Sequence, residues 1–379
     1  MDSDRLQQIC EVVPVAMLVV DPAGWVAAAN AASTAMFGND PIGRPFVTVV
    51  RQPAVNRALD WVLKPEGPPP AGLPARAGAA RLAATISAQG RDLSTVVTVS
   101  PLAVQGGHGA AVVIEDSTGV EHAEQMRRDF VANVSHELRT PLTALMGFID
   151  TLRGPARNDA AAQERFLDIM AREAGRMNRL IADLLSLSRV EGEERRRPAE
   201  IVDLAGLIRS VAATTGPAAR ESGVTLTLRG TAQPVRLPGD ADQIMQVFHN
   251  LFENAIKYGG GQVTVTLTRI PHEPALRGPG WATEVADNGD GIEALHLPRL
   301  TERFYRVDTH RSREKGGTGL GLAIVKHIVA RHRGRLKIDS EKGRGSRFTV
   351  ILPEAAPGRA APGAGGPGIE APSSGGQAG

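Results

Sequence analysis

A histidine in a helix-like segment is the first candidate for chemistry. His136 is followed directly by Glu137, and Thr140 lies four residues after the histidine, so His136 and Thr140 share one face of a helix. An exposed imidazole beside a carboxylate and a hydroxyl can act as a nucleophile. Pro141 in the same segment removes one backbone hydrogen bond and loosens the preceding turn. By spacing alone, a histidine that merely lies on a helix surface is the simpler interpretation.

A second group of polar side chains lies on a helix predicted over residues 240–258. The apolar residues of this helix form a buried side, whereas Asn250, Asn254 and Lys257 recur at i, i+4 and i+7. Two amide oxygens could ligate a hard cation, and the lysine could neutralise a phosphate. Spacing alone favours a solvated face, so these residues need support from other motifs.

A strand-like segment that ends at Asp287 is followed by a short loop with Gly289 and Gly291. The two glycines would permit close approach of the backbone to a ligand. A buried carboxylate here could accept a hydrogen bond from an exocyclic amine, which would select adenine over guanine. The Asp-x-Gly-x-Gly pattern is weak evidence alone because calcium loops share it, although the downstream acidic ligand of an EF-hand is absent.

A glycine-rich loop opens the last apolar helix, which is predicted over residues 323–330. The loop includes Gly317, Thr318, Gly319, Leu320 and Gly321. A loop of this kind before a helix is a general cradle for phosphate, but it matches neither the Walker A nor the Rossmann pattern. The basic stretch at residues 309–315 could close over the phosphates as a lid.

Two long helices between residues 120 and 190 must position the histidine. Apolar residues recur at spacings of three and four along both helices, and Gly154, Pro155, Asn158 and Asp159 mark the turn between them. Two antiparallel helices cannot cover both apolar stripes alone, and burial of each leucine-sized side chain stabilises by ~1.5–3 kcal/mol. We therefore expect two hairpins to pair into a four-helix bundle in an obligate homodimer.

The composition excludes several classes of protein. The chain has 379 residues, 42% of them hydrophobic, which fits two or three folded domains. A net charge of +2 gives no global basic field, so no direct binding of nucleic acid is expected. The single cysteine, Cys10, excludes an intramolecular disulfide and fits a reducing cytosol. We find neither a signal peptide nor a transmembrane segment, so we predict a cytoplasmic protein.

The run from Ser135 to Leu142, Ser-His-Glu-Leu-Arg-Thr-Pro-Leu, resembles letter for letter the phospho-accepting H-box of sensor histidine kinases. The resemblance implies that His136 attacks the γ-phosphorus of ATP through Nε2. It also implies that Glu137 accepts a hydrogen bond from the other ring nitrogen and helps to remove the proton. Thr140 would position a water during dephosphorylation of the partner.

The later motifs resemble, in order and spacing, the N, G1, F and G2 boxes of the histidine-kinase ATP domain. The resemblance implies ATP and Mg²⁺ as cofactors, with Asn250 and Asn254 facing the metal and Asp287 recognising adenine. Lys257 and either Arg303 or Arg306 would approach the phosphates. The ATP site would also include Tyr258, Gly289, Gly291, Phe304, Gly317, Thr318, Gly319, Leu320 and Gly321.

The expected fold is α+β and multidomain. Residues 8–116 contain five strand-like runs separated by turns and resemble a PAS sensor domain of α/β type. Residues 120–192 form the dimeric helical hairpin, and residues 200–354 form an α/β sandwich of the Bergerat type, which gyrase-type ATPases share. Residues 355–379, rich in Ala, Gly and Pro, are predicted to be a disordered tail.

Residues 50–59 and 128–136 are most similar to phosphate-regulon sensor kinases. The similarity implies phosphotransfer to an aspartate of a response regulator receiver domain in phosphate-starvation signalling. Such kinases usually carry transmembrane helices before the PAS domain, which leaves membrane association open. The alternatives are a gyrase-like or chaperone-like ATPase, a serine kinase of the anti-sigma type and a non-catalytic scaffold. Acid-labile, base-stable phosphate on His136 would distinguish the histidine kinase from the other enzymes.

Overall fold

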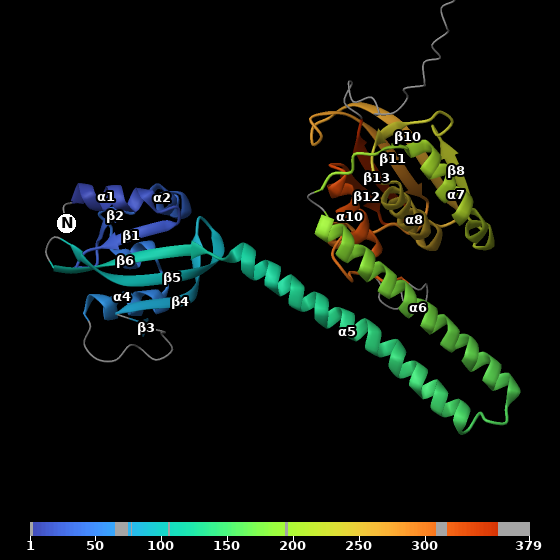
Figure 1. Ribbon diagram of the computed structural model, residues 1–379, viewed down its shortest axis with the longest axis horizontal. Coiled ribbons are helices and arrows are strands. Elements are labelled where there is room, and N and C mark those ends of the chain that lie inside the picture. The colour runs from blue at the N-terminus through green and yellow to red at the C-terminus, as the bar shows by residue number, and fades with distance from the viewer. Residues whose placement is uncertain are drawn as a thin grey trace, which may run out of the picture. The chain divides into compact units, whose positions relative to one another are not determined.

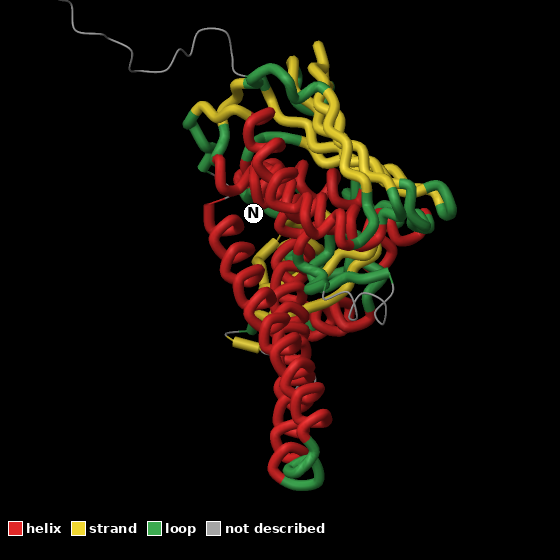
Figure 2. Tube along the Cα trace, turned by 90° about the vertical axis from the view of Figure 1, so that its right-hand side faces the viewer, coloured by secondary structure: helices red, strands yellow, loops and turns green. Residues whose placement is uncertain are grey.

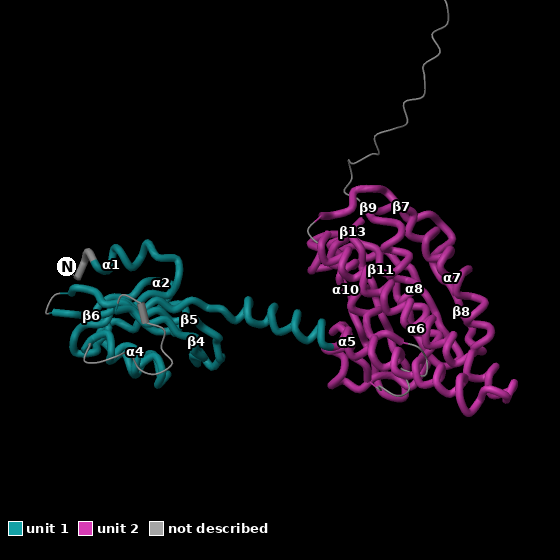
Figure 3. Tube along the Cα trace, turned by 60° about the horizontal axis from the view of Figure 1, so that its bottom comes forward, with its two compact units in different colours: residues 1–132 teal, residues 133–379 magenta. Residues whose placement is uncertain are grey.

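A computed structural model divides the chain into two compact units, residues 1–132 and 133–379 (Figure 3). It describes residues 3–64, 75–76, 78–104, 107–193, 196–307 and 317–354. The predicted tail at 355–379 and the basic stretch at 309–315 lie outside the described residues. Within the described ranges, no helix has both the length and the sustained apolar composition that crossing a bilayer requires.

The first unit contains a six-stranded antiparallel sheet with strand order β2-β1-β6-β5-β4-β3 (Figure 1). Its strands are β1 (Ala16–Val20), β2 (Val26–Ala29), β3 (Ala75–Arg76), β4 (Ala79–Ala88), β5 (Arg91–Val104) and β6 (Gly107–Asp116). The helices are α1 (Ser3–Val12), α2 (Ala31–Phe37), α3 (Phe46–Val49) and α4 (Pro53–Leu63). The five predicted strand-like runs correspond to β1, β2, β4, β5 and β6, whereas β3 was not predicted.

Both faces of this sheet are covered by apolar packing. The larger core joins inward-facing strand residues such as Leu18 and Val112 to the buried side of α4, including Val55. A smaller cluster joins Leu6 and Cys10 of α1 to strand residues on the other face. Cys10 is 1% exposed, and burial raises the pKa of its thiol.

The second unit includes most of a helical hairpin formed by α5 (Thr118–Arg153) and α6 (Ala160–Glu193) (Figure 2). The predicted turn is confirmed, because Asp159 caps α6 by accepting a hydrogen bond from the amide of Ala162 at 2.9 Å. Phe148 and Phe166 pack across the hairpin with their ring centroids 5.5 Å apart. Large apolar side chains stay exposed on both helices, among them Leu142, Met146, Ile149, Leu167, Ile181 and Leu185.

The rest of the second unit is an α/β sandwich, as predicted. Its five-stranded sheet has the order β12-β13-β11-β10-β8, with only the β10–β8 pair parallel. The strands are β8 (Thr225–Arg229), β10 (Gln262–Glu273), β11 (Gly278–Asp287), β12 (Arg335–Glu341) and β13 (Gly345–Pro353). The smaller elements are β7 (Ile201–Asp203), β9 (Arg236–Pro238) and the 3₁₀ helix η1 (Ala294–Arg299).

Among the described residues of the sandwich, the helices of the second layer are α7 (Leu204–Glu221), α8 (Ala241–Tyr258) and α10 (Gly321–Arg331). Helix α8 lies between α7 and α10 and contacts the central strand β11. The amide of Asn288, directly after β11, donates to the carbonyl of Gly259, directly after α8, at 3.2 Å. The C-terminal ends of α8 and β11 therefore lie side by side, and they form one wall of the pocket described next.

Candidate functional site

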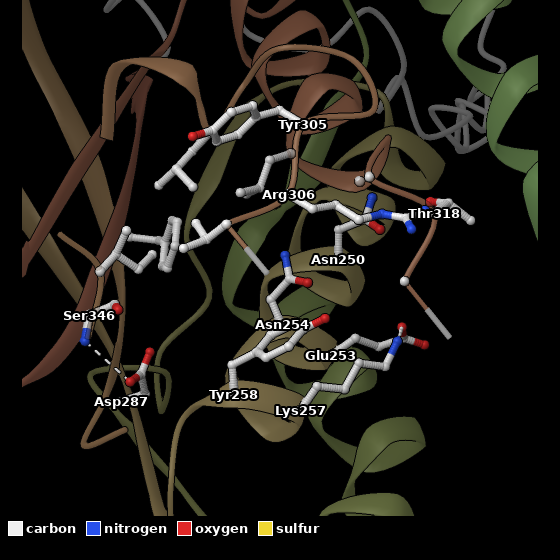
Figure 4. Close-up of a pocket in the computed structure, with 18 of the residues that line it drawn as sticks. Asn250, Glu253, Asn254, Lys257, Tyr258, Asp287, Tyr305, Arg306, Thr318 and Ser346 are labelled. Atoms are coloured by element: carbon white, nitrogen blue, oxygen red, sulfur yellow. Dashed lines mark hydrogen bonds and ion pairs between the residues drawn. The ribbon is translucent and has the colours of Figure 1, made fainter. Parts of the chain in front are cut away.

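A pocket of about 430 Å³ opens between α8, the end of β11, the loop before α10 and one side of α6 (Figure 4). Eleven residues predicted from the sequence line it: Asn250, Asn254, Lys257, Tyr258, Asp287, Gly291, Arg306, Gly317, Thr318, Gly319 and Gly321. Four other predicted residues of this site, Gly289, Arg303, Phe304 and Leu320, are not part of the described lining. The structure thus gathers motifs that are up to 71 residues apart in the sequence around one cavity.

Helix α8 presents its polar stripe to the pocket because its opposite side is apolar and buried. Its first turn is capped by Asp240, whose side chain accepts from the amide of Gln243. Phe248 and Phe252 are fully buried on the sheet-facing side. Figure 4 shows Asn250 and Asn254 one above the other on the pocket side. The stripe thus lines a pocket, and its role in binding stays a prediction.

Glu253 lies within the same stripe and was not singled out from the sequence. Its carboxylate pairs with the ammonium group of Lys257 at 2.5 Å, and both residues line the pocket. Burial acts to raise the pKa of Glu253, but the hydrogen bond and charge of Lys257 outweigh burial and hold this pKa below its ordinary value. The four-residue spacing of Glu253 and Lys257 was a signal that could have identified the pair.

Asp287 ends β11 and faces the pocket as a partly buried carboxylate. Its Oδ1 accepts hydrogen bonds from the amides of Gly289 at 3.0 Å and Ser346 at 3.1 Å. Burial raises the pKa of Asp287 in spite of these two bonds. The carboxylate is thus fixed in place by the backbone, in a position where a ligand amine could compensate for its burial.

Two glycines allow the walls of the pocket to approach each other closely. Gly291 has a φ of +64°, and a Cβ there would lie 2.0 Å from the carbonyl oxygen of Glu341. A Cβ on Gly321 would lie 3.0 Å from Oδ1 of Asn250. The start of α10 therefore packs directly against the polar stripe of α8.

The Phe304 segment and the glycine-rich loop are joined by their backbones. Phe304 has a φ of +64°, in the left-handed region that is unfavourable for a bulky residue, and its amide donates to the carbonyl of Gly319 at 2.9 Å. The next residue, Tyr305, lines the pocket, and its hydroxyl lies 2.6 Å from Nδ1 of His296. Leu320, in contrast, is fully buried and packs in the core.

His136, the predicted phosphoryl acceptor, lies on the exposed surface of α5. The Thr140 hydroxyl, four residues later, donates to the carbonyl of His136 at 3.1 Å. The intervening Glu137 is only 18% exposed, and its Oε2 accepts from Arg176 of α6 and from Arg306, each at 3.1 Å. Because Arg306 also lines the pocket, Glu137 connects the hairpin to the pocket.

Helix α6 supplies pocket residues that the sequence analysis missed. Arg179, Ala182 and Asp183 line the cavity, and the Thr318 hydroxyl donates to Oδ2 of Asp183 at 2.6 Å. Burial raises the pKa of Asp183, against the effect of the Thr318 hydrogen bond. No local motif marks these residues. The sequence analysis therefore interpreted α6 only as a dimerisation helix.

Arg303 also turns toward α6. Its guanidinium pairs with Oε1 of Glu191 at 2.6 Å, and His327 of α10 lies 3.6 Å from the same oxygen. The two arginines predicted for the phosphates therefore differ: Arg306 lies at the pocket and Arg303 lies in the contact between α6 and the sandwich.

Two family models match this part of the chain. The "His Kinase A (phospho-acceptor) domain" matches residues 126–193, and the "Histidine kinase-, DNA gyrase B-, and HSP90-like ATPase" matches residues 239–356. The first match contains His136 and the hairpin, and the second contains α8, Asp287 and the glycine-rich loop. Most of the first unit lies outside both matches, so its PAS assignment stays a prediction.

Individual relatives are sensor kinases. The phosphate regulon sensor protein PhoR of Pseudomonas aeruginosa is 41% identical over 257 residues, which are 65% of this chain and 55% of that protein. The sensor-like histidine kinase SenX3 of Mycolicibacterium smegmatis is 38% identical over 247 residues, 65% of this chain and 62% of that protein. The solved structure of the Acinetobacter baumannii histidine kinase AdeS aligns with a TM-score of 0.44 at 26% identity, over 57% of this chain and 96% of that one. The chain thus spans 55–62% of the length of these two curated relatives.

Proposed function

We propose that this chain is a sensor histidine kinase, which transfers the γ-phosphoryl group of ATP to His136 and then to an aspartate of a response regulator. One observation carries the proposal. A single pocket combines the amides of Asn250 and Asn254, a lysine, the carboxylate of Asp287 and a glycine-rich loop, and Arg306 in that pocket also pairs with the residue next to His136.

The chain's own residues can perform each part of the transfer. Asp287 would accept a hydrogen bond from the adenine amine, while Lys257 and Arg306 offset the phosphate charge. His136 would attack in line through Nε2, so that a nitrogen–phosphorus bond forms, the bond to the bridging oxygen breaks and ADP leaves. Glu137 would accept a hydrogen bond from the other ring nitrogen and help to remove the proton.

A magnesium ion fits the donor atoms of the pocket. The side-chain oxygens of Asn250 and Asn254 are hard ligands on one side of α8, and Mg²⁺ binds through few protein oxygens while it keeps water and phosphate oxygens as further ligands. When bound, the ion would neutralise charge on the transferred phosphoryl group. We assign Asn250 and Asn254 as the residues that would hold it.

We also propose a homodimer as the working form. Leu142 is 49% exposed, Met146 60% and Leu185 60%, and these side chains lie on the two helices of the hairpin. A second hairpin would cover them as a four-helix bundle does. The partner in phosphotransfer would be a receiver domain, and Thr140 would position the water that later hydrolyses the phosphate on that domain.

Phosphate-starvation signalling is the proposed context, and the likeness to PhoR supports it. The test is a panel of receiver domains from the same organism, each incubated with chain already labelled on His136. Transfer to the phosphate-starvation regulator should be faster than to every other receiver. Equal rates across the panel would contradict the assignment without affecting the kinase proposal.

The kinase proposal is tested with [γ-³²P]ATP and Mg²⁺. The wild-type chain should take up label that is labile in acid and stable in base, and His136→Gln should take up none. His122→Gln, a change in another histidine of α5, serves as the matched control and should leave labelling intact. Acid-stable label, or ATP hydrolysis that His136→Gln leaves unchanged, would favour the serine kinase or the simple ATPase instead.

A further inference from the structure

The side chain of Glu137 lies between two arginines that come from different parts of the second unit. Arg176 reaches it from α6, and Arg306 reaches it from the segment beside the glycine-rich loop. Both guanidinium groups contact the same oxygen, Oε2, at 3.1 Å. We call Glu137, Arg176 and Arg306 the H-box clamp.

The two arginines of the H-box clamp have different surroundings. Arg176 is 15% exposed, is not part of the described pocket lining, and belongs to the same hairpin as Glu137. Arg306 is 6% exposed and lines the pocket that we assign to ATP. Only Arg306 can therefore exchange its carboxylate partner for a phosphate that enters the pocket.

We propose that the H-box clamp couples nucleotide binding to the acceptor site. Arg306 moves from Glu137 to the phosphates when the nucleotide binds, and Arg176 is a positioning residue that holds Glu137 during this exchange. This inference rests on the proposed function. A triphosphate carries more negative charge than one carboxylate and accepts bidentate hydrogen bonds from arginine, so it competes well for Arg306. Arg176 keeps Glu137 oriented after this exchange, and Glu137 then serves His136.

The exchange predicts an unusual effect on nucleotide binding. Glu137 competes with the phosphates for Arg306, so Glu137→Gln should bind a non-hydrolysable Mg²⁺–ATP analogue about fivefold more tightly than wild type, as expected for removal of one ion pair. Simple repulsion between Glu137 and the phosphates would also tighten binding. The Arg306→Gln background distinguishes the two causes. If Glu137 competes for Arg306, Glu137→Gln should not increase the affinity for the analogue in that background, whereas direct repulsion would still increase it.

The role of Arg176 is tested by rates of autophosphorylation. Because a misplaced proton acceptor loses much of its 10²–10⁴-fold effect, Arg176→Gln should lower kcat about tenfold or more at an unchanged KM for ATP. Arg176→Lys keeps the charge and should restore part of kcat. Arg172→Gln, one turn earlier at an exposed position of α6, is the matched control and should leave both constants unchanged.

Circular dichroism and sedimentation should show the same fold and association state for all of these variants. A gain from Glu137→Gln that persists in the Arg306→Gln background, or the absence of any gain, would overturn the exchange. An unchanged kcat in Arg176→Gln, or no recovery in Arg176→Lys, would overturn the positioning role. The affinity measurements with the non-hydrolysable analogue need no phosphoryl transfer, so they test the exchange even if His136 takes up no label.

Discussion

Helices α5 and α8 carry apolar residues at the same helical spacing, but they are covered to very different degrees. In α8, six of 18 residues are buried, including Ile244, Leu251 and Phe252. In α5, Pro141 is the one buried residue among those described for the 36-residue helix, and Leu142 and Met146 are largely exposed. The apolar face of α8 is thus buried within one chain, whereas α5 has an exposed apolar surface that a second hairpin could bury.

This difference separates two tasks. The proposed nucleotide pocket includes the polar stripe of α8, and the opposite face of that helix is buried. The proposed acceptor, His136, lies on α5, whose exposed apolar residues we propose to be the dimer contact. Changes in α8 should therefore affect nucleotide chemistry or the stability of the sandwich, and changes in α5 should affect self-association.

The largest effect is expected from Asn254→Ala. Loss of an amide oxygen from the assigned magnesium site should abolish labelling of His136, while sedimentation finds the same dimer as in wild type. Asn178→Ala, at an exposed position of α6, is the control and should label normally. Retained labelling in Asn254→Ala would refute the metal role.

Phe252→Ala should cost the sandwich about 3–5 kcal/mol in the free energy of unfolding, because Phe252 is fully buried and its removal leaves a cavity. Urea unfolding measures this value. Leu142→Ala, at a position of the hairpin that is 49% exposed in one chain, should change the free energy of unfolding of the sandwich by no more than about 0.5 kcal/mol. Similar costs at both positions would remove the contrast between α8 and α5.

Charges on the exposed face of α5 should weaken self-association. Leu142→Asp combined with Met146→Asp places two carboxylates where a dimer would bury apolar side chains, and the dissociation constant should rise about 100-fold or more. Sedimentation equilibrium measures this constant. Nucleotide affinity should stay the same, and an unchanged dimer would mean that another surface joins the two copies.

The smallest effect concerns pH. The ionised form of Asp287 is a stronger acceptor for the adenine amine than the neutral form. Burial raises the pKa of Asp287, so protonation weakens binding at a higher pH than for an ordinary aspartate. Calorimetric titration with ADP should therefore show affinity falling as the pH decreases through this raised pKa, by at most about tenfold per unit. Asp287→Asn should bind weakly with a flat profile over the same range, and a parallel decline in this variant would assign the effect to another group.

Local features of the fold were predictable from the sequence because they depend on neighbouring residues. Asp240 and the apolar spacing after it define α8, and the residues from Gly154 to Asp159 define the hairpin turn. The position of Asp287 at the end of a strand also follows from alternation and the glycines after it. Helix α4 was not identified individually, although Pro53 in its first turn and the apolar spacing of Val55, Ala58, Leu59 and Val62 are comparable signals.

Contacts between the hairpin and the sandwich were not predictable. The pair Glu137–Arg306 joins residues 169 positions apart, and the Thr318–Asp183 bond spans 135 positions. Neither pair has a sequence spacing that would reveal it, because each depends on how one folded element packs against another. The motifs therefore predicted eleven of the residues that line the pocket, but neither the residues from α6 nor the different partners of Arg303 and Arg306.

The buried position of Cys10 has a practical consequence. The chain has one cysteine, and its thiol is both 1% exposed and held protonated by a raised pKa, so it should react slowly with maleimides at neutral pH. A cysteine introduced at an exposed site, such as Arg172 of α6, could then carry a fluorophore or spin label selectively in the otherwise native sequence. The movements expected at the nucleotide pocket are thus open to direct spectroscopic measurement.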